Sequence, residues 1–168
     1  MPDHTAPERI FSVLFLCTGN SARSILLESL LNRLGQPIGL SAFSAGSHPT
    51  GRVHPEAARL LAGLGYQTGR LRSKSWDEFA LLGAPVMDLV ITVCASAAGE
   101  ACPLWPGAPL KAHWGVDDPA ALPEADQPSA FRATFDILER RAWALVALDL
   151  AGTNRDRLTT ELDRIGRL

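Results

Sequence analysis

A short apolar run that ends in a cysteine and continues through a small loop into a helical pattern is the most constraining feature of this sequence. Residues 12–16 are Ser-Val-Leu-Phe-Leu, without a charge, as expected for a strand covered on both faces. Residues 17–23 form a short polar loop. Residues 24–34 carry apolar side chains at helical spacing, and Gly35 is expected to stop this helix. Strand, loop and helix in this order favour a parallel α/β fold.

The rest of the sequence continues this alternation of short apolar runs and helical patterns. Strands are predicted over residues 39–45, 88–93 and 110–113, and helices over residues 55–64, 76–82, 131–150 and 154–165. In the long helix, residues 139–141 are expected to face solvent, and residues 95–110 are predicted to form an irregular loop. We therefore predict a single α/β domain over residues 10–168, with a central parallel four-stranded sheet, helices on both sides and a flexible N-terminal tail at residues 1–9.

The composition excludes several classes of partner. The chain has 168 residues, of which 46% are hydrophobic and 20% charged, with a formal net charge of -2, a normal balance for a globular domain. The basic residues are scattered, so no nucleic-acid partner is expected. No apolar stretch approaches the about 18 residues that a membrane helix requires, and the first residues do not have the pattern of a secretory peptide. A cytoplasmic monomer without a membrane partner is expected.

The loop at residues 17–23 has the pattern Cys-x5-Arg. The pattern is common by itself, but its position between a strand and a helix indicates a binding site. Ligands of α/β proteins bind at the carboxyl ends of strands, where this loop lies. Gly19 permits unusual backbone dihedrals, and Asn20 is the non-glycine residue most tolerant of a positive φ. We predict a phosphate-binding loop whose backbone N–H groups form a nest, with the dipole of the following helix adding positive potential. The predicted oxyanion-binding residues are Thr18, Gly19, Asn20, Ser21, Ala22, Arg23 and Ser24.

The same loop is predicted to activate Cys17. A field that binds an oxyanion also stabilises a thiolate, so Cys17 is expected to be a nucleophile at neutral pH. Ser21 or Ser24 is expected to donate a hydrogen bond to its sulfur, and the planar fork of Arg23 suits two oxygens of an oxyanion. The alternative interpretation is a buried cysteine that closes a strand, with Arg23 on the solvent face of a helix. The complete unit of strand, loop and helix disfavours this alternative.

Residues 17–24, Cys-Thr-Gly-Asn-Ser-Ala-Arg-Ser, resemble the active-site loop of the low-molecular-weight protein tyrosine phosphatase fold. Within that fold, the chain is most similar to the thioredoxin-coupled arsenate reductases, over residues 11–150. The resemblance implies that Cys17 attacks arsenate, and that a second thiol then attacks Cys17, releases arsenite and leaves a disulfide. It also implies thioredoxin as the external reductant, with glutaredoxin and glutathione as the other possibility, and no bound cofactor.

Two further cysteines, Cys94 and Cys102, follow a predicted central strand. An odd number of cysteines in a chain of this length does not indicate a structural disulfide framework. Residues 94–103 resemble the redox segment of the reductases, although the spacing of the two cysteines is slightly longer. This resemblance implies a Cys17–Cys94 disulfide followed by a Cys94–Cys102 disulfide. The alternative is that both residues are buried small hydrophobic side chains.

Residues 113–119, His-Trp-Gly-Val-Asp-Asp-Pro, resemble a loop of the reductase family that carries an acidic group. Asp118, directly before the proline, is the better candidate for the general acid that protonates the leaving oxygen, and Asp117 is second. The alternative is a simple Asp-Asp-Pro turn. Tyrosine phosphatases of this fold carry tyrosines after their Asp-Pro. Ala120 and Ala121 stand there in this chain, which disfavours a phosphotyrosine pocket.

No catalytic metal is predicted. The four histidines have no metal-ligand spacing with the cysteines and are expected to be surface or capping residues, namely His4, His48, His54 and His113. Some relatives hold a potassium ion beside the loop. Asn20, Glu28 and Ser44 match three of its ligand positions, while the fourth falls near Trp76, with Asp77 adjacent. The potassium site is therefore left open.

Arsenate reduction is the function predicted from these features, and two other functions remain open. The first is a phosphatase of the same fold that hydrolyses phosphate monoesters, with Cys94 and Cys102 as bystanders. The second is a non-enzymatic sensor that binds arsenate or phosphate and reports the redox state. The only tyrosine of the chain is Tyr66, which also disfavours a phosphotyrosine pocket.

Overall fold

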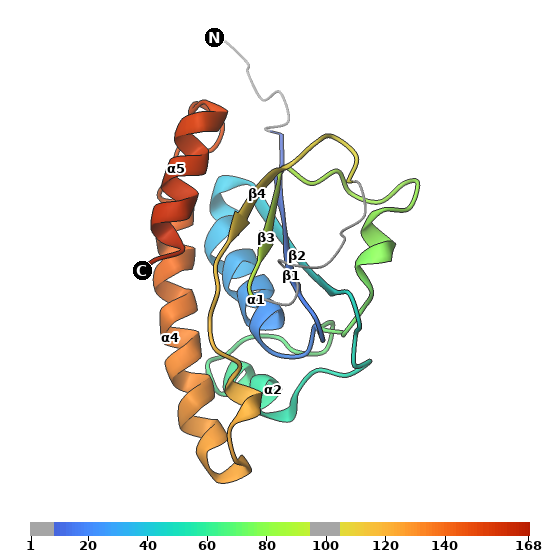
Figure 1. The fold of residues 1–168 in the computed structure, drawn as a ribbon, viewed down its shortest axis with the longest axis vertical. Coiled ribbons are helices and arrows are strands. Elements are labelled where there is room, and N and C mark those ends of the chain that lie inside the picture. The colour runs from blue at the N-terminus through green and yellow to red at the C-terminus, as the bar shows by residue number, and fades with distance from the viewer. Residues whose placement is uncertain (1–8, 95–104) are drawn as a thin grey trace.

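Four parallel strands form the centre of the protein. In the computed structural model, which describes residues 9–94 and 105–168, they are β1 (Phe11–Cys17), β2 (Leu40–Gly46), β3 (Leu89–Thr92) and β4 (Leu110–His113). The strands hydrogen-bond in the order β2-β1-β3-β4, every pair parallel, and Figure 1 shows them side by side. The α/β fold with a parallel four-stranded sheet, predicted from the sequence, is confirmed.

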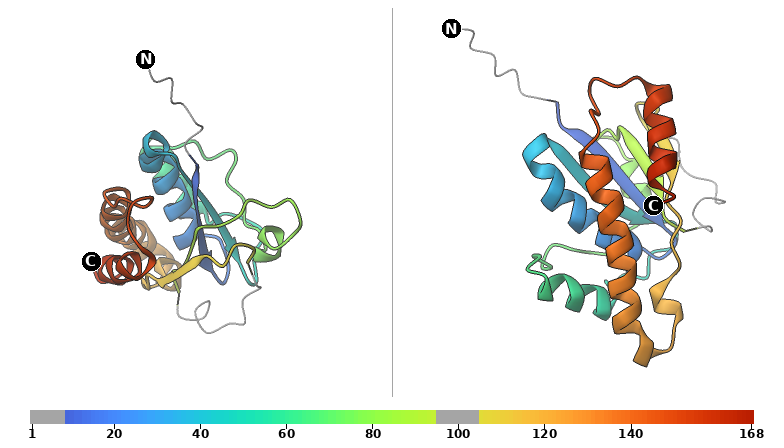
Figure 2. Two further views of the ribbon diagram at one scale, coloured as in Figure 1. Left: turned by 90° about the horizontal axis from the view of Figure 1, so that it is seen from above. Right: turned by 90° about the vertical axis from the view of Figure 1, so that its left-hand side faces the viewer.

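Helices cover one face of this sheet. They are α1 (Arg23–Gly35), α2 (Pro55–Gly63), α4 (Gln127–Val146) and α5 (Arg155–Ile165). Figure 2 shows α1, α4 and α5 together on one side of the strands. The larger apolar core contains side chains of these helices and of the sheet, with Phe15, Trp114, Phe131 and Phe135 among those fully buried. Removal of this apolar area from water is the main stabilisation of the fold.

The opposite face of the sheet differs from the prediction of helices on both sides. There, Leu14 and Leu16 of β1 belong to a second buried cluster with Trp76, Phe79 and Trp105. Instead of the helix predicted over residues 76–82, the chain forms a short 3-10 helix, η2 (Trp76–Phe79). Further 3-10 turns are η1 (Gln36–Ile38), η3 (Pro119–Ala121) and η4 (Glu124–Asp126).

The helix α1 ends at Gly35, as predicted, and the left-handed turn follows after η1 at Gly39, which has φ 74°. The bounds and exposure predicted for the long helix are wrong. The long helix α4 begins and ends earlier than predicted, at Gln127 and Val146. Arg141 of α4 is only 5% exposed, although residues 139–141 were expected to face solvent.

The strand order positions the functional site. Because β1 lies between β2 and β3, the chain leaves β1 toward one side of the sheet and later returns to its other side. The carboxyl edge at such a reversal is where α/β folds bind ligands. The loop after Cys17 lies at this edge, as predicted.

No helix among residues 9–94 and 105–168 is long and apolar enough to cross a membrane. The predicted N-terminal tail falls almost entirely outside the described residues, as does most of the loop predicted over residues 95–110, so these two predictions stay predictions.

Candidate active site

The loop between β1 and α1 wraps around the sulfur of Cys17. Cys17 is the last residue of β1, is 3% exposed, and is followed at Arg23 by the start of α1. Asn20 has φ 45°, so it takes the left-handed position that lets the loop curl, and its backbone N–H donates to Cys17 Sγ over 3.1 Å. Ser24 Oγ lies 2.9 Å from Cys17 Sγ. The predicted contact between a serine and the sulfur is therefore made by Ser24.

Neighbouring segments hold the loop from its outer side. Backbone N–H groups of residues 48–54 donate to loop carbonyls: His48 to Thr18 (2.9 Å), Thr50 to Gly19 (3.0 Å) and His54 to Ser21 (2.9 Å). Because a trans peptide points its C=O and N–H in opposite directions, the N–H groups that follow these carbonyls face the interior of the loop. This is the geometry of an oxyanion nest, and oxyanion binding by residues 18–24 stays a prediction.

Gly46 belongs to this site and was missed by the sequence analysis. It is the last residue of β2 and pairs with Cys17 in the strand register. A Cβ at Gly46 would lie 2.4 Å from the Thr18 carbonyl oxygen and 3.0 Å from the Asn20 nitrogen. Only glycine lets the loop pass this close to β2. A glycine at the end of a predicted strand was the available signal.

Arg23 joins the Cys17 loop to the segment that carries Asp118. Its Nη1 donates to the Val116 carbonyl over 3.0 Å, and its Nη2 lies 3.8 Å from Asp118 Oδ2. The predicted oxyanion anchor and the predicted general acid are thus neighbours. The side chain of Asp118 is 43% exposed, and its Oδ1 accepts the Ala120 N–H over 2.9 Å, which caps η3. Asp118 therefore makes the predicted turn and also lies within reach of the site.

A buried arginine, Arg141, holds the start of this segment and was also missed. Its Nη1 donates to the carbonyls of Trp114 (3.0 Å) and Gly115 (3.2 Å), and its Nη2 donates to the Leu168 carbonyl (3.3 Å). Burial lowers the pKa of the Arg141 guanidinium below its ordinary value, and the like charge of Arg140 lowers it further. The segment before Asp118 is thus held by one buried arginine and by Arg23.

Cys94 lies beside the Cys17 loop. It follows β3, is 5% exposed, and its Sγ lies 3.6 Å from Oγ1 of Thr18, the residue after Cys17. Cys17 and Cys94 are both present as thiols. Cys102 lies outside the described residues, so its predicted exchange with Cys94 stays a prediction.

Known proteins share this sequence pattern and this fold. The model of the low molecular weight phosphotyrosine protein phosphatase family matches residues 12–158. The chain belongs to this family. It is 35% identical to the arsenate reductase of Halalkalibacterium halodurans over 132 residues, which are 77% of this chain and 90% of that protein. It is 37% identical to the arsenate reductase of Bacillus subtilis over 109 residues, which are 64% of this chain and 73% of that protein.

Solved structures agree with this membership of the low molecular weight phosphatase family. The crystal structure of arsenate reductase from Archaeoglobus fulgidus superposes with a TM-score of 0.64 at 29% identity, over 81% of this chain and 99% of that one. The resemblance seen in residues 17–24 is thereby confirmed, and the relatives named here are arsenate reductases within the phosphatase fold.

Lys74 lies beside the residues that match the potassium-ligand positions of some relatives. Ser44 Oγ donates to Glu28 Oε2 over 2.7 Å, so two of the matched positions do meet. Lys74 Nζ lies 3.5 Å from Ser44 Oγ and 3.9 Å from Glu28 Oε1. The third matched position, Asn20, directs its Oδ1 to the Lys74 backbone N–H over 2.9 Å. With an ammonium group among these oxygens, the described residues do not fit an additional potassium ion.

The described histidines occupy capping or surface positions. His54 caps the start of α2, where its Nδ1 accepts the Glu56 N–H over 3.1 Å. His48 and His113 are exposed, and His113 Nδ1 lies 2.7 Å from Thr92 Oγ1. These positions agree with the expectation of surface or capping roles.

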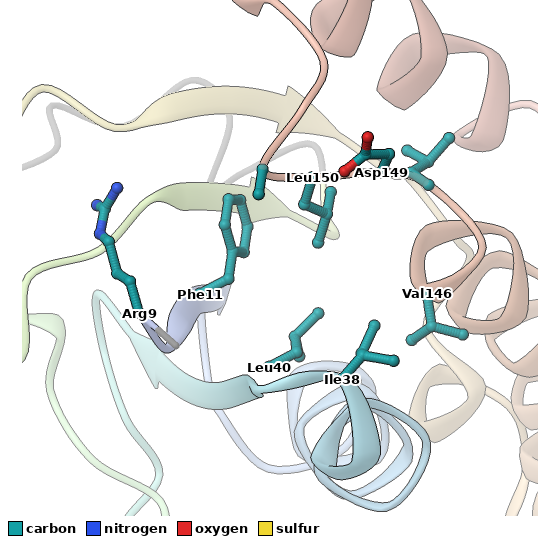
Figure 3. Close-up of a pocket in the computed structure, with 9 residues that line it drawn as sticks. Arg9, Phe11, Ile38, Leu40, Val146, Asp149 and Leu150 are labelled. Carbon is teal, nitrogen blue, oxygen red and sulfur yellow. The ribbon is translucent and has the colours of Figure 1, made fainter. Parts of the chain in front are cut away.

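A cavity of about 370 Å³ at the other end of the sheet is a poor candidate for the active site. It is lined by Phe11 and Leu40, which begin β1 and β2, by Val146 and by residues 148–151 (Figure 3). Among the residues that the structure describes, its lining is mainly apolar and contains no cysteine, and Arg9 is the only basic side chain. The oxyanion-binding loop predicted from the sequence lies at the opposite, carboxyl edge of the strands.

Proposed function

We propose that the protein reduces arsenate to arsenite, with Cys17 as the nucleophile and Cys94 as the thiol that resolves its adduct. The observation that carries the proposal is the 3.6 Å separation between Cys94 Sγ and Thr18 Oγ1, which sets a second thiol beside the Cys17 loop. A hydrolase of this fold requires only the first thiol. The arsenate reductases of Halalkalibacterium halodurans and Bacillus subtilis, which are similar to this chain, support the same choice.

In the first step, the Cys17 thiolate attacks the arsenic of an arsenate held by the loop N–H groups and by Arg23. An S–As bond forms and one As–O bond breaks. The departing oxygen takes a proton from Asp118 and leaves as water. The 3.8 Å separation of Arg23 Nη2 and Asp118 Oδ2 supports this division of roles, because the acid then lies next to a bound oxyanion.

In the second step, the Cys94 thiolate attacks Cys17 Sγ. A Cys17–Cys94 disulfide forms as the S–As bond breaks, and the bonding electron pair stays on arsenic, which leaves as arsenite. Arsenic gains two electrons, and the two thiols lose two. Cys102 then attacks Cys94, which releases the Cys17 thiolate and leaves a Cys94–Cys102 disulfide.

The cycle closes when an external dithiol reduces this last disulfide. We assign the reduction to thioredoxin, as the resemblance of the sequence to the thioredoxin-coupled reductases implies, with glutaredoxin and glutathione as the alternative system. Both act in the reducing cytoplasm, where we place the protein. Because the electrons pass only between thiols and arsenic, no bound cofactor enters the scheme.

The proposal is tested by arsenate-dependent NADPH oxidation with purified protein, thioredoxin and thioredoxin reductase. We expect sustained oxidation that requires arsenate and is lost in Cys17→Ser. If glutaredoxin with glutathione and glutathione reductase is required instead, the reductase assignment holds and the partner changes. Absence of arsenate-dependent oxidation in both systems contradicts the proposal.

Phosphate-ester hydrolysis is the second candidate, because the matched family is one of phosphatases. The position of Tyr66 disfavours a phosphotyrosine pocket. Its ring lies 3.3 Å from Arg33 Cζ and 6.2 Å from the Phe135 ring, so it packs against α1 and α4. Rapid hydrolysis of p-nitrophenyl phosphate, unchanged in Cys94→Ser, would favour the phosphatase.

A further inference from the structure

A buried pair of opposite charges lies behind the Cys17 loop. The side chains of Lys74 and Glu28 are 7% and 14% exposed, and their charged atoms are 3.9 Å apart. Lys74 Nζ also donates to the Arg72 carbonyl over 3.2 Å and lies 3.5 Å from Ser44 Oγ. The chain has only two lysines, and this one is buried.

Burial of Glu28 and Lys74 removes two charged groups from water, which lowers the stability of the fold. A pair retained at such a cost suggests a functional role. Burial raises the pKa of the Glu28 carboxyl, although the Lys74 charge opposes this. Burial likewise lowers the pKa of the Lys74 ammonium, and the Glu28 charge opposes that shift. Each group is thus held in a place that disfavours its charge and is stabilised there by its partner. An apolar pair in the same volume would avoid this cost.

The backbone of Lys74 leads directly to the nucleophile. Its N–H donates to Asn20 Oδ1 over 2.9 Å, and Asn20 Nδ2 donates to Ser24 Oγ over 2.9 Å. Ser24 Oγ is the group that lies 2.9 Å from Cys17 Sγ. Three contacts therefore connect the segment that carries the ammonium to the attacking sulfur.

The same hydrogen bonds hold Asn20, the residue of the loop with a positive φ. Asn20 is fully buried and has φ 45°, a conformation that needs support from its surroundings. Its side chain is held at both ends, by the Lys74 N–H and by Ser24 Oγ. The adjacent Ser73 adds a second support, because its Oγ donates to the Gly19 carbonyl over 3.0 Å. The position of residues 72–74 thus sets the shape of the Cys17 loop.

We infer that Lys74 is a positioning residue whose ammonium acts as a built-in cation. It ties residues 72–74 to Glu28 and Ser44. This contact in turn holds Asn20, Ser24 and the Cys17 sulfur in place. The inference rests on the proposed function for its effect on arsenate turnover, whereas its effect on the sulfur can be measured without arsenate. It also requires the protein to work without an added monovalent cation, since the ammonium already lies among the Glu28 and Ser44 oxygens.

The first experiment measures the reactivity of Cys17 directly. The parent protein carries Cys94→Ser and Cys102→Ser, and it is compared with the same protein carrying Lys74→Met. Two quantities are measured: the second-order rate of Cys17 alkylation by iodoacetamide at neutral pH, and the dissociation constant of inorganic phosphate. We expect alkylation about tenfold slower and phosphate binding about tenfold weaker, as for loss of one buried polar contact. Lys111→Met, which removes the exposed lysine of β4, is the matched control and leaves both values unchanged.

A second variant separates positioning from simple stability. Lys74→Met/Glu28→Gln removes both charges, and the amide that replaces the Glu28 carboxylate can still meet Ser44, so the variant avoids a lone buried carboxylate. If Lys74 only stabilises the fold, this double variant alkylates at the parent rate, and the inference is overturned. If Lys74 positions the loop, the double variant folds and still alkylates about tenfold more slowly.

The cation requirement provides an independent test. Alkylation is measured in potassium chloride and in choline chloride at equal ionic strength, for the parent protein and for Lys74→Ala. The inference predicts the same rate in both salts for the parent protein and a faster rate in potassium for Lys74→Ala. A potassium response of the parent protein as large as that of Lys74→Ala contradicts it. These readouts do not involve arsenate, so failure here leaves the proposed reductase intact, and failure of arsenate turnover leaves these results intact.

Discussion

The Cys17 loop and the Asp118 segment, the two halves of the candidate site, are held in different ways. The loop is fixed by backbone hydrogen bonds to its carbonyls and by close packing against Gly46, and Cys17 is almost fully buried. The Asp118 carboxylate is nearly half exposed, and two arginine side chains hold its segment. The Cys17 sulfur and its loop are thus in place before a substrate arrives, whereas the position of Asp118, the proposed acid, depends on Arg23 and Arg141.

Arg23, at the end of the Cys17 loop, contacts the Asp118 segment. Its Nη1 donates to the Val116 carbonyl, and Arg23 is also the proposed anchor of the oxyanion. A bound arsenate would therefore share its anchor with the segment that carries Asp118. Preorganised groups lower the cost of reaching the transition state, so we expect loss of the Cys17 thiol to have a larger effect than loss of the Asp118 carboxyl.

The largest expected effect comes from the centre of the loop. Cys17→Ser should lower arsenate reduction by at least about a thousandfold, because a serine hydroxyl is a far weaker nucleophile at neutral pH. Arsenite formation is measured by chromatography with arsenic detection. Cys94→Ser serves as the control for loop integrity and should bind inorganic phosphate like the wild type. Residual turnover of about a tenth or more in Cys17→Ser would contradict the assignment.

In the acid segment, Asp118→Asn should lower kcat about a hundredfold, the lower range for a general acid, since the carboxylate is partly exposed. Asn still caps η3, so the fold of the segment is kept. Asp117→Asn, next to it and exposed, is the matched control and should change kcat little. Equal losses in the two variants would remove Asp118 from its proposed role.

A smaller effect is expected from Gly46→Ala, which tests the rigidity of the loop. The new Cβ meets the Thr18 carbonyl oxygen at 2.4 Å, so the loop must shift. We expect phosphate binding to weaken about tenfold and unfolding free energy to fall by about 2 kcal/mol, as for other overpacked sites. Gly63→Ala in α2 meets nothing within 4 Å and should be neutral or stabilising. Unchanged phosphate affinity in Gly46→Ala would show that the loop is softer than its contacts indicate.

The smallest effect on turnover is expected from Arg141→Met, which removes the buried support of the acid segment. The carbonyls of Trp114 and Gly115 lose a donor, so the free energy of unfolding should fall by about 2 kcal/mol in urea titrations. We expect kcat to fall only about threefold, because Arg23 still holds Val116. Arg140→Met, an exposed neighbour, is the control. A loss of activity as large as that of Asp118→Asn would mean that Arg141 alone positions the acid.

The Cys17 loop could be predicted from the sequence because its structure is local. The apolar strand, the tolerance of Asn20 for a positive φ and the start of α1 all lie within a short stretch, and the structure confirms them. The Asp118 segment was found through its resemblance to a family motif. Its location beside Arg23 depends on strands far apart in the sequence, which no local pattern reveals.

The two charged residues that were missed, Arg141 and Lys74, share one physical cause. Arg141 follows two charged residues in a helical pattern, and only the packing of α4 against the rest of the domain shows that it is buried. Lys74 stands between two serines, in a stretch typical of an exposed turn, and its burial depends on Glu28 and Ser44 from other elements. Side chains whose partners come from distant segments have no signature in their own neighbourhood.

The most direct test of the central claim is a single-turnover measurement with Cys102→Ser. Arsenate is added to the reduced variant with thioredoxin, thioredoxin reductase and NADPH, arsenite is counted, and disulfides are mapped by mass spectrometry. The three-thiol relay predicts about one arsenite per chain, followed by a halt with Cys17 joined to Cys94. Sustained turnover at the wild-type rate, or arsenite release without a Cys17–Cys94 disulfide, would contradict it.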